Sequence, residues 1–255
     1  MEIGIYCTSV RPHLWGRLYE SLSQNNVDFN LCIAGPCPPT EPLPGNVKYI
    51  QTNVKPPQCN FIAANNTKGD YIMLVPDDIW ISRGALDNML QIIIQKQNII
   101  VGIALAPNAY ISPRCPVDPP YLFITEFSWQ RTDRQIQFTT LNFPFPVSPL
   151  MRREDFNSIG IDKNFIGALW DIDMIFEHVS RGVEINICDK SFAYDMSTFN
   201  HLGDLAIGVG DHYRLINMWF SENKIRLTRL SPIDPLVYND TVLTVSQGPK
   251  LDCWN

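Results

Sequence analysis

Short apolar runs alternate with amphipathic segments through the first hundred residues, and this alternation constrains the fold more than any other feature of the chain. Strands are predicted over residues 2–7, 29–34, 47–52, 71–75 and 99–105, and helices over 12–22, 58–66 and 82–95. Strands that alternate with helices are joined by crossover connections, which give a mainly parallel sheet. The pattern therefore predicts an α/β fold, with a mixed, mainly parallel central sheet flanked by helices.

The second half of the chain is less regular, and prolines interrupt it. Its patterns predict helices over 153–159, 170–181 and 211–220, and strands over 135–140 and 183–188. The total length of 255 residues, 45% of them hydrophobic, suits one domain with a sizeable core. We expect this domain to span residues 1–225, with residues 226–255 as an extended tail that packs on it.

Charge and cysteine usage exclude several classes of protein. The formal net charge of −6 gives no overall basic field for nucleic acid. No apolar run is long enough for a transmembrane segment, and the first residues do not resemble a signal peptide. The seven cysteines form no CxxC pair, so a reducing, cytoplasmic location is expected. The motifs of dehydrogenases, kinases, zinc proteases and esterases do not occur.

The strongest local signal is the segment from Gly69 to Asp78. A strongly apolar strand runs directly into Pro76, Asp77 and Asp78, so two adjacent carboxylates are delivered to the end of a buried strand. Open α/β sheets bind their ligands at the carboxyl ends of strands. Adjacent carboxylates repel each other unless a cation is present, and Mg²⁺-like ions are bound by one or two carboxylates and substrate phosphates. From spacing alone, a metal site and a solvated turn both remain open.

Several segments, in this order, resemble glycosyltransferases of the GT-A fold, and most of all glycosyltransferase family 2. Residues 8–11 are similar to the turn that meets the nucleotide, and residues 58–72 to the helix and strand that precede the metal motif. Residues 76–78 stand where the family has its DxD-type motif. Residues 151–160 resemble the acceptor-side segment, and residues 167–173 the acidic motif before a helix.

The resemblance implies an activity and a division of the domain. It implies transfer of a sugar from a nucleoside-diphosphate donor to a hydroxyl of a glycan or other acceptor, with Mn or Mg and with inversion. UDP- and GDP-linked donors both fit, with a slight preference for UDP. Residues 1–105 would bind the nucleotide sugar, and residues 106–225 the acceptor.

The resemblance also assigns residues to roles. The donor would be bound by Thr8, Ser9, Arg11, Asn60 and Asp77, and the metal by Asp78 with His201. Trp170 and Asp173 would bind the acceptor, and Arg214 could approach a phosphate. Asp171 is the candidate catalytic base, which would take a proton from the acceptor hydroxyl. The alternative for Asp171 is a helix N-cap without a chemical role.

Three departures from the family keep other functions open. Pro76 replaces the first aspartate of the metal motif, Trp170 replaces the glutamate that often precedes the base, and residues 34–36 lack the acidic residue that reads the nucleotide. A catalytically inactive GT-A protein that binds nucleotides or glycans is therefore one alternative. A sugar nucleotidylyltransferase is a weaker one, because the turn after the first strand lacks the glycine-rich basic loop of such enzymes.

Overall fold

A computed structural model of the chain describes most of the predicted domain. The described residues are 1–105, 122–123, 128–131, 134–137, 144–167, 169–195, 211 and 214. His201, the tail over 226–255 and all but two residues of the helix expected over 211–220 lie outside them, so those predictions are not tested.

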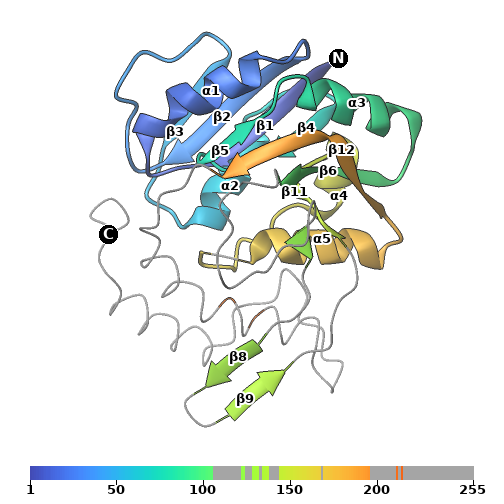
Figure 1. Ribbon diagram of the computed structural model, residues 1–255. Helices are drawn as coiled ribbons and strands as arrows, with labels where there is room; N and C mark the ends of the chain where they lie inside the picture. Colours follow the sequence, from blue (N-terminus) through green and yellow to red (C-terminus); the bar gives the residue numbers. More distant parts are fainter. Residues whose placement is uncertain are drawn as a thin grey trace.

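The centre of the fold is an eight-stranded sheet with the strand order β3-β2-β1-β4-β11-β6-β12-β5 (Figure 1). The strands are β1 (Glu2–Thr8), β2 (Asp28–Gly35), β3 (Val47–Gln51), β4 (Tyr71–Leu74), β5 (Ile79–Ile81), β6 (Ile99–Leu105), β11 (Val147–Arg152) and β12 (Glu184–Asp195). Strands β3, β2, β1 and β4 pair in parallel, as do β6 and β12, whereas β11 and β5 are antiparallel to their neighbours. The prediction of a mixed, mainly parallel sheet is confirmed.

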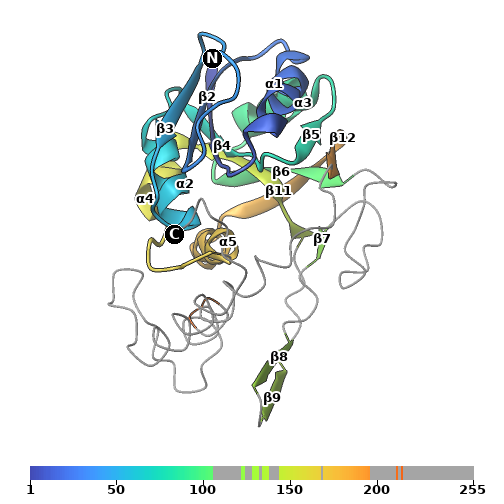
Figure 2. The same cartoon turned by 90° about the vertical axis from the view of Figure 1, so that its left-hand side faces the viewer.

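Helices cover both faces of this sheet (Figure 2). They are α1 (Trp15–Ser23), preceded by a 3₁₀ turn (Pro12–Leu14), α2 (Pro56–Asn65), α3 (Ala85–Gln95), α4 (Arg153–Ile159) and α5 (Trp170–Ser180). Side chains of α1 and α3 pack in one core, and those of α2, α4 and α5 in the other. Successive residues of β1 alternate between the two cores: Ile5 and Cys7 belong to the first, and Tyr6 to the second.

Two small two-stranded sheets are separate from the main sheet. They are formed by β7 (Leu122–Phe123) with β10 (Pro144–Phe145), and by β8 (Ser128–Arg131) with β9 (Arg134–Gln137). Residues 135–137 of the strand expected over 135–140 lie in β9, and residues 138–140 are outside the described residues.

Two strands of the main sheet were not predicted, and each has a local reason. Strand β5 has only three residues, and the helix expected from Ser82 begins three residues later, at Ala85. Strand β11 contains a proline, and Ser148 has a positive φ of 46° where the pairing with β6 shifts register. Irregular strands of this kind lack the alternation that marks a strand in sequence. No helix within the described ranges is long and apolar enough to cross a membrane.

Candidate functional site

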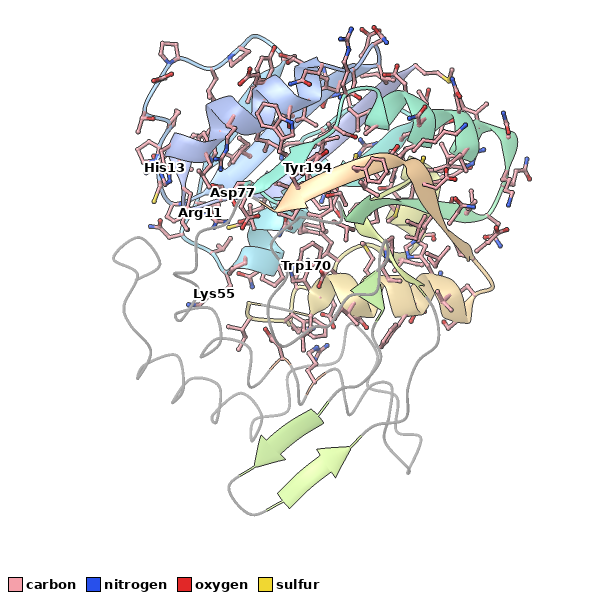
Figure 3. The ribbon with its side chains drawn as sticks, viewed as in Figure 1. Arg11, His13, Lys55, Asp77, Trp170 and Tyr194 are labelled. Atoms are coloured by element: carbon pink, nitrogen blue, oxygen red, sulfur yellow. The ribbon has the colours of Figure 1, made fainter. Side chains whose placement is uncertain are left out.

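The candidate site lies at the carboxyl ends of β1 and β4, which are adjacent and parallel. The two strands run in register as far as Tyr6 and Leu74, and the next amide, that of Val75, donates to the Tyr6 carbonyl at 3.1 Å. The amide of Ile79 then donates to the Pro76 carbonyl at 3.4 Å. Asp77 and Asp78 are thus the two central residues of a tight turn, beside the loop that follows β1 (Figure 3).

Ser9 joins this turn to the start of α1. Its hydroxyl donates to Asp77 Oδ2 at 2.5 Å, and it accepts hydrogen bonds from the indole Nε1 of Trp15 at 2.7 Å and from the Arg11 amide at 3.0 Å. Ser9 and Asp77 are each only 4% exposed. We predicted from the sequence that Ser9 and Asp77 belong to one site, and the two side chains are in contact. The hydrogen bond from Trp15 to Ser9 was not predicted.

Arg11 binds both aspartates through one guanidinium group. Its Nε donates to Asp77 Oδ2 at 3.1 Å, and its Nη2 contacts Asp77 Oδ1 and, at 2.9 Å, Asp78 Oδ2. Burial lowers the pKa of Arg11, but the hydrogen bonds and charges of Asp77 and Asp78 raise it by more, so the net shift is upward. The turn is therefore neither a solvated loop nor an open carboxylate pair, because a partly buried ion pair occupies it.

The carboxylates in this arrangement do not fit a divalent ion. Both oxygens of Asp77 already accept hydrogen bonds, and the cationic side chain of Arg11 contacts both aspartates. Within the described ranges, no group of three His, Cys, Asp or Glu side chains is placed to hold a metal. His201, the second expected ligand, is outside those ranges, so its role stays a prediction.

Thr8 and the end of β2 complete the edge of the site. The Thr8 hydroxyl donates to the Ala34 carbonyl at 3.1 Å, and the Ser9 amide donates to the same oxygen at 3.2 Å. A Cβ on Gly35 would lie 2.0 Å from the carbonyl oxygen of Ser9, so only glycine allows this approach of the two loops. Backbone groups, rather than an acidic side chain, stand at the end of β2.

Asn60 lies in the interior rather than at the surface of the site. It is 1% exposed, and its Nδ2 donates to the Pro56 carbonyl at 3.2 Å within α2. Its Oδ1 is buried and accepts no hydrogen bond from the part of the chain that the structure describes. The donor contact that the resemblance implied for Asn60 is not tested, and the side chain is buried in this arrangement.

Asp171 is the second residue of α5, and its side chain is partly exposed. Burial raises the pKa of Asp171, although hydrogen bonds from its own amide and from that of Ile172 oppose the shift. The charge of Asp171 in turn adds to the burial that raises the pKa of Tyr6, on β1. The carboxylate thus lies within electrostatic range of the strand that leads to Thr8 and Ser9.

The two residues expected to bind the acceptor are both buried. Trp170, at the start of α5 in Figure 3, is 6% exposed, and Asp173 is fully buried. Trp170 packs in the core formed with α2 and α4. Neither side chain presents a face to an acceptor in this arrangement, so the expectation is not supported for either residue.

A buried ion pair holds the loop that leads into α5. Arg214 donates to Asp162 Oδ2 through Nε at 3.0 Å and Nη2 at 2.5 Å, with both side chains almost fully buried. The carboxylate of Asp211 accepts the amides of Ile166 at 2.7 Å and Gly167 at 2.6 Å. Arg214 therefore braces this loop through Asp162, and its expected approach to a phosphate stays a prediction. No local motif links these distant residues in the sequence.

Comparison with known proteins identifies the fold. No family model matches the chain, and no curated protein sequence does so either. Crystal structures of TarS from S. aureus are similar in structure at low sequence identity. The structure of TarS residues 1–349 matches with a TM-score of 0.53 and 13% identity over 97% of this chain and 80% of that one.

Two further TarS structures carry ligands. The complex with UDP matches with a TM-score of 0.57 and 12% identity over 96% of this chain and 81% of the other. The complex with UDP-GlcNAc matches with a TM-score of 0.56 and 13% identity over 97% and 80%. The chain shares its GT-A-like α/β fold with these TarS structures.

Proposed function

We propose that this chain transfers a sugar from a nucleoside-diphosphate donor to a hydroxyl group of an acceptor. The observation that carries the proposal is the cluster of Ser9, Arg11, Asp77 and Asp78 at the carboxyl ends of two adjacent parallel strands, where open α/β sheets bind ligands. The similar TarS structures hold UDP and UDP-GlcNAc, which supports a UDP-linked donor.

Arg11 is the residue best placed to meet the donor diphosphate. Its side chain is 30% exposed, and the aspartates engage only Nε and Nη2. Nη1 has no partner among the described residues, so its two N–H groups can donate to a phosphate oxygen. A guanidinium held on one side by carboxylates is already oriented, and less conformational entropy is lost when it binds the diphosphate.

Asp171 would act as the catalytic base. Its carboxylate accepts the proton of the acceptor hydroxyl while the oxygen of that hydroxyl forms a bond to the anomeric carbon. The bond from that carbon to the diphosphate oxygen breaks, its electrons leave with the diphosphate, and the configuration inverts. A carboxylate with a raised pKa holds a proton more strongly than an ordinary aspartate, which suits this role.

An aromatic pair near the aspartates is a better acceptor surface than Trp170. Tyr194 on β12 lies directly opposite Trp80 on β5. Trp80 follows Asp78 by only two residues in the sequence. Because opposite residues of an antiparallel pair share a face, the two rings lie on the same side of the sheet. Tyr194 is 42% exposed, and the flat faces of such rings suit the apolar face of an acceptor sugar.

The test is a donor-hydrolysis assay on the purified chain. It uses a panel of UDP- and GDP-sugars with Mn²⁺, with Mg²⁺ and with EDTA, and compares the wild type with Asp78→Ala and with the exposed control Asp189→Ala. We expect the wild type and the control to release sugar, and Asp78→Ala to lose most of that release. Nucleotide binding without turnover under every condition would favour the catalytically inactive alternative. Nucleotide-sugar formation from a nucleoside triphosphate would favour the nucleotidylyltransferase.

A further inference from the structure

The aspartate pair already has a cation of its own. Three contacts run from the Arg11 guanidinium to the pair, two to Asp77 and one of 2.9 Å to Asp78. Asp77 Oδ2 accepts a further hydrogen bond from Ser9 at 2.5 Å. The guanidinium therefore contacts the oxygens through which the two residues could together hold an ion.

A divalent ion and this guanidinium cannot share the pair. Mg²⁺ takes oxygen ligands at about 2.0–2.1 Å in a near-octahedral arrangement, and it needs carboxylate oxygens that face it. An ion at that distance from Asp77 and Asp78 would lie within a few ångströms of the positive charge of Arg11, with strong mutual repulsion. The hydrogen bonds of Arg11 to both residues would also have to break.

We propose that Arg11 is the resident cation of the Asp77–Asp78 pair, and that a divalent ion binds these carboxylates only by displacing it. The neighbouring Pro76 supports this, because it adds no carboxylate to the turn, so an ion there would have only the carboxylates of Asp77 and Asp78 as ligands from these three residues. With Arg11 in place the three side chains carry a net charge of −1, and without it the pair carries −2. Loss of the arginine should therefore create a cation site.

The proposal is tested by Mn²⁺ binding to the protein in the absence of a nucleotide sugar. Free and bound Mn²⁺ are distinguished by electron paramagnetic resonance during a titration of the wild type, Arg11→Gln and Arg83→Gln. Arg83 is an exposed arginine five residues after Asp78 in the sequence, so its replacement makes the same change in net charge without removing a contact to the pair. We expect Arg11→Gln to bind Mn²⁺ at least about tenfold more tightly than the wild type, and Arg83→Gln to match the wild type.

A double variant shows whether the gained Mn²⁺ site includes Asp78. Adding Asp78→Asn to Arg11→Gln should abolish the gain in Mn²⁺ affinity. Equal affinity in the wild type and Arg11→Gln, or a gain that survives Asp78→Asn, would overturn the proposal. Neither result depends on turnover, so failure here is distinguishable from failure of the proposed function.

A measurement on the wild type covers the case in which Arg11→Gln does not fold. The ¹⁵N-bound proton of Arg11 Nε, identified by its absence in Arg11→Lys, should exchange slowly with solvent because it donates to a buried carboxylate oxygen. We expect this protection to persist when Mg²⁺ is added at millimolar concentration. A Mg²⁺-dependent change in the side-chain carboxylate signals of Asp77 and Asp78 with this protection unchanged would show that the ion and Arg11 share the pair, and it would overturn the proposal.

Discussion

The hydroxyl of Ser9, after β1, donates a 2.5 Å hydrogen bond to the carboxylate of Asp77, after β4. The two residues are 68 positions apart in the chain, and both are 4% exposed. Because the indole of Trp15 donates to the same hydroxyl, one oxygen ties together the end of β1, the turn after β4 and the start of α1. The geometry of the candidate site therefore depends on a small buried hydroxyl as well as on charged groups.

Replacement of Ser9 by alanine should destabilise the protein. The change leaves the Trp15 indole without its acceptor and removes one donor from the buried Asp77, and such losses typically cost about 1–3 kcal/mol. The free energy of unfolding in urea measures the effect. Ser23→Ala is the control, because its exposed hydroxyl donates only to a carbonyl one turn earlier in α1. Equal stability of Ser9→Ala and the control would contradict the prediction.

Gly35→Ala should also destabilise the protein, and through a steric effect. The added methyl group would lie 2.0 Å from the Ser9 carbonyl oxygen, so the loops after β1 and β2 must separate. Overpacking of this kind typically costs about 1–3 kcal/mol. Gly45→Ala is the matched control, since a Cβ there has no atom within 4 Å among the described residues. Thermal unfolding compares the two variants, and equal midpoints would refute the steric explanation.

Much of the fold could be predicted from the sequence because its first half is regular. The strand expected over 99–105 and the helix over 153–159 have the predicted bounds, and the strand expected at 71–75 ends within one residue of β4. In contrast, β5 is too short to show a period. The last strand, expected to end at 188, continues to Asp195 through a register shift, where alternation is lost.

The residues that form the candidate site could be predicted from the sequence better than the contacts between them. Local pattern placed Ser9, Asp77 and Asp78 at strand ends, where parallel topology brings them together. It could not show that Arg11 would contact both aspartates, because that contact depends on side-chain packing across 66 residues of sequence. For the same reason, the buried positions of Asn60 and Asp173 could not be read from their polar side chains.

Asp171→Asn should retain donor affinity and lose turnover. The amide cannot accept the proton of the acceptor hydroxyl, and loss of general-base catalysis typically lowers the rate by about 10²–10⁴-fold. Steady-state kinetics with a donor identified by the hydrolysis assay, and calorimetric titration of that donor, measure the two effects. Asp189→Asn, on an exposed position of β12, controls for loss of one negative charge. Turnover that is unchanged in Asp171→Asn would leave Asp171 with only a structural role, as the acceptor of hydrogen bonds from amides in the first turn of α5.

The same variant should show a defined dependence of stability on pH. Because burial raises the folded-state pKa of Asp171, the unfolded chain loses its proton first as the pH rises from about 3.9. The wild type is therefore destabilised progressively until the pH passes the raised pKa, and asparagine has no such titration. The free energy of unfolding of Asp171→Asn relative to the wild type should increase between pH 3 and pH 7.

Urea unfolding at a series of pH values measures this difference. Repeating the series in 1 M salt is the control, because salt screens charge–charge interactions but leaves the effect of burial. A difference that is constant or that falls with pH would show that burial does not control this carboxyl group.

Arg214→Met should strongly destabilise the protein, because it leaves the carboxylate of Asp162 buried without its cation. The two side chains are 3% and 0% exposed, and loss of one partner of a buried pair typically costs about 3–5 kcal/mol. Adding Asp162→Asn should recover part of that loss, since asparagine is neutral and keeps an oxygen for the hydrogen bonds from Asn164.

The exposed pair of Lys96 and Glu184 provides the comparison for Arg214. Its side chains are 49% and 56% exposed at a separation of 2.8 Å, so Lys96→Met should cost only about 0–1 kcal/mol. Urea unfolding of the wild type and the three variants gives the comparison, and a loss in Arg214→Met no larger than that in Lys96→Met would contradict the prediction. Because the braced loop leads directly into Trp170 and Asp171, Arg214→Met should also lower turnover. The double variant should recover part of the lost turnover, as it recovers part of the lost stability.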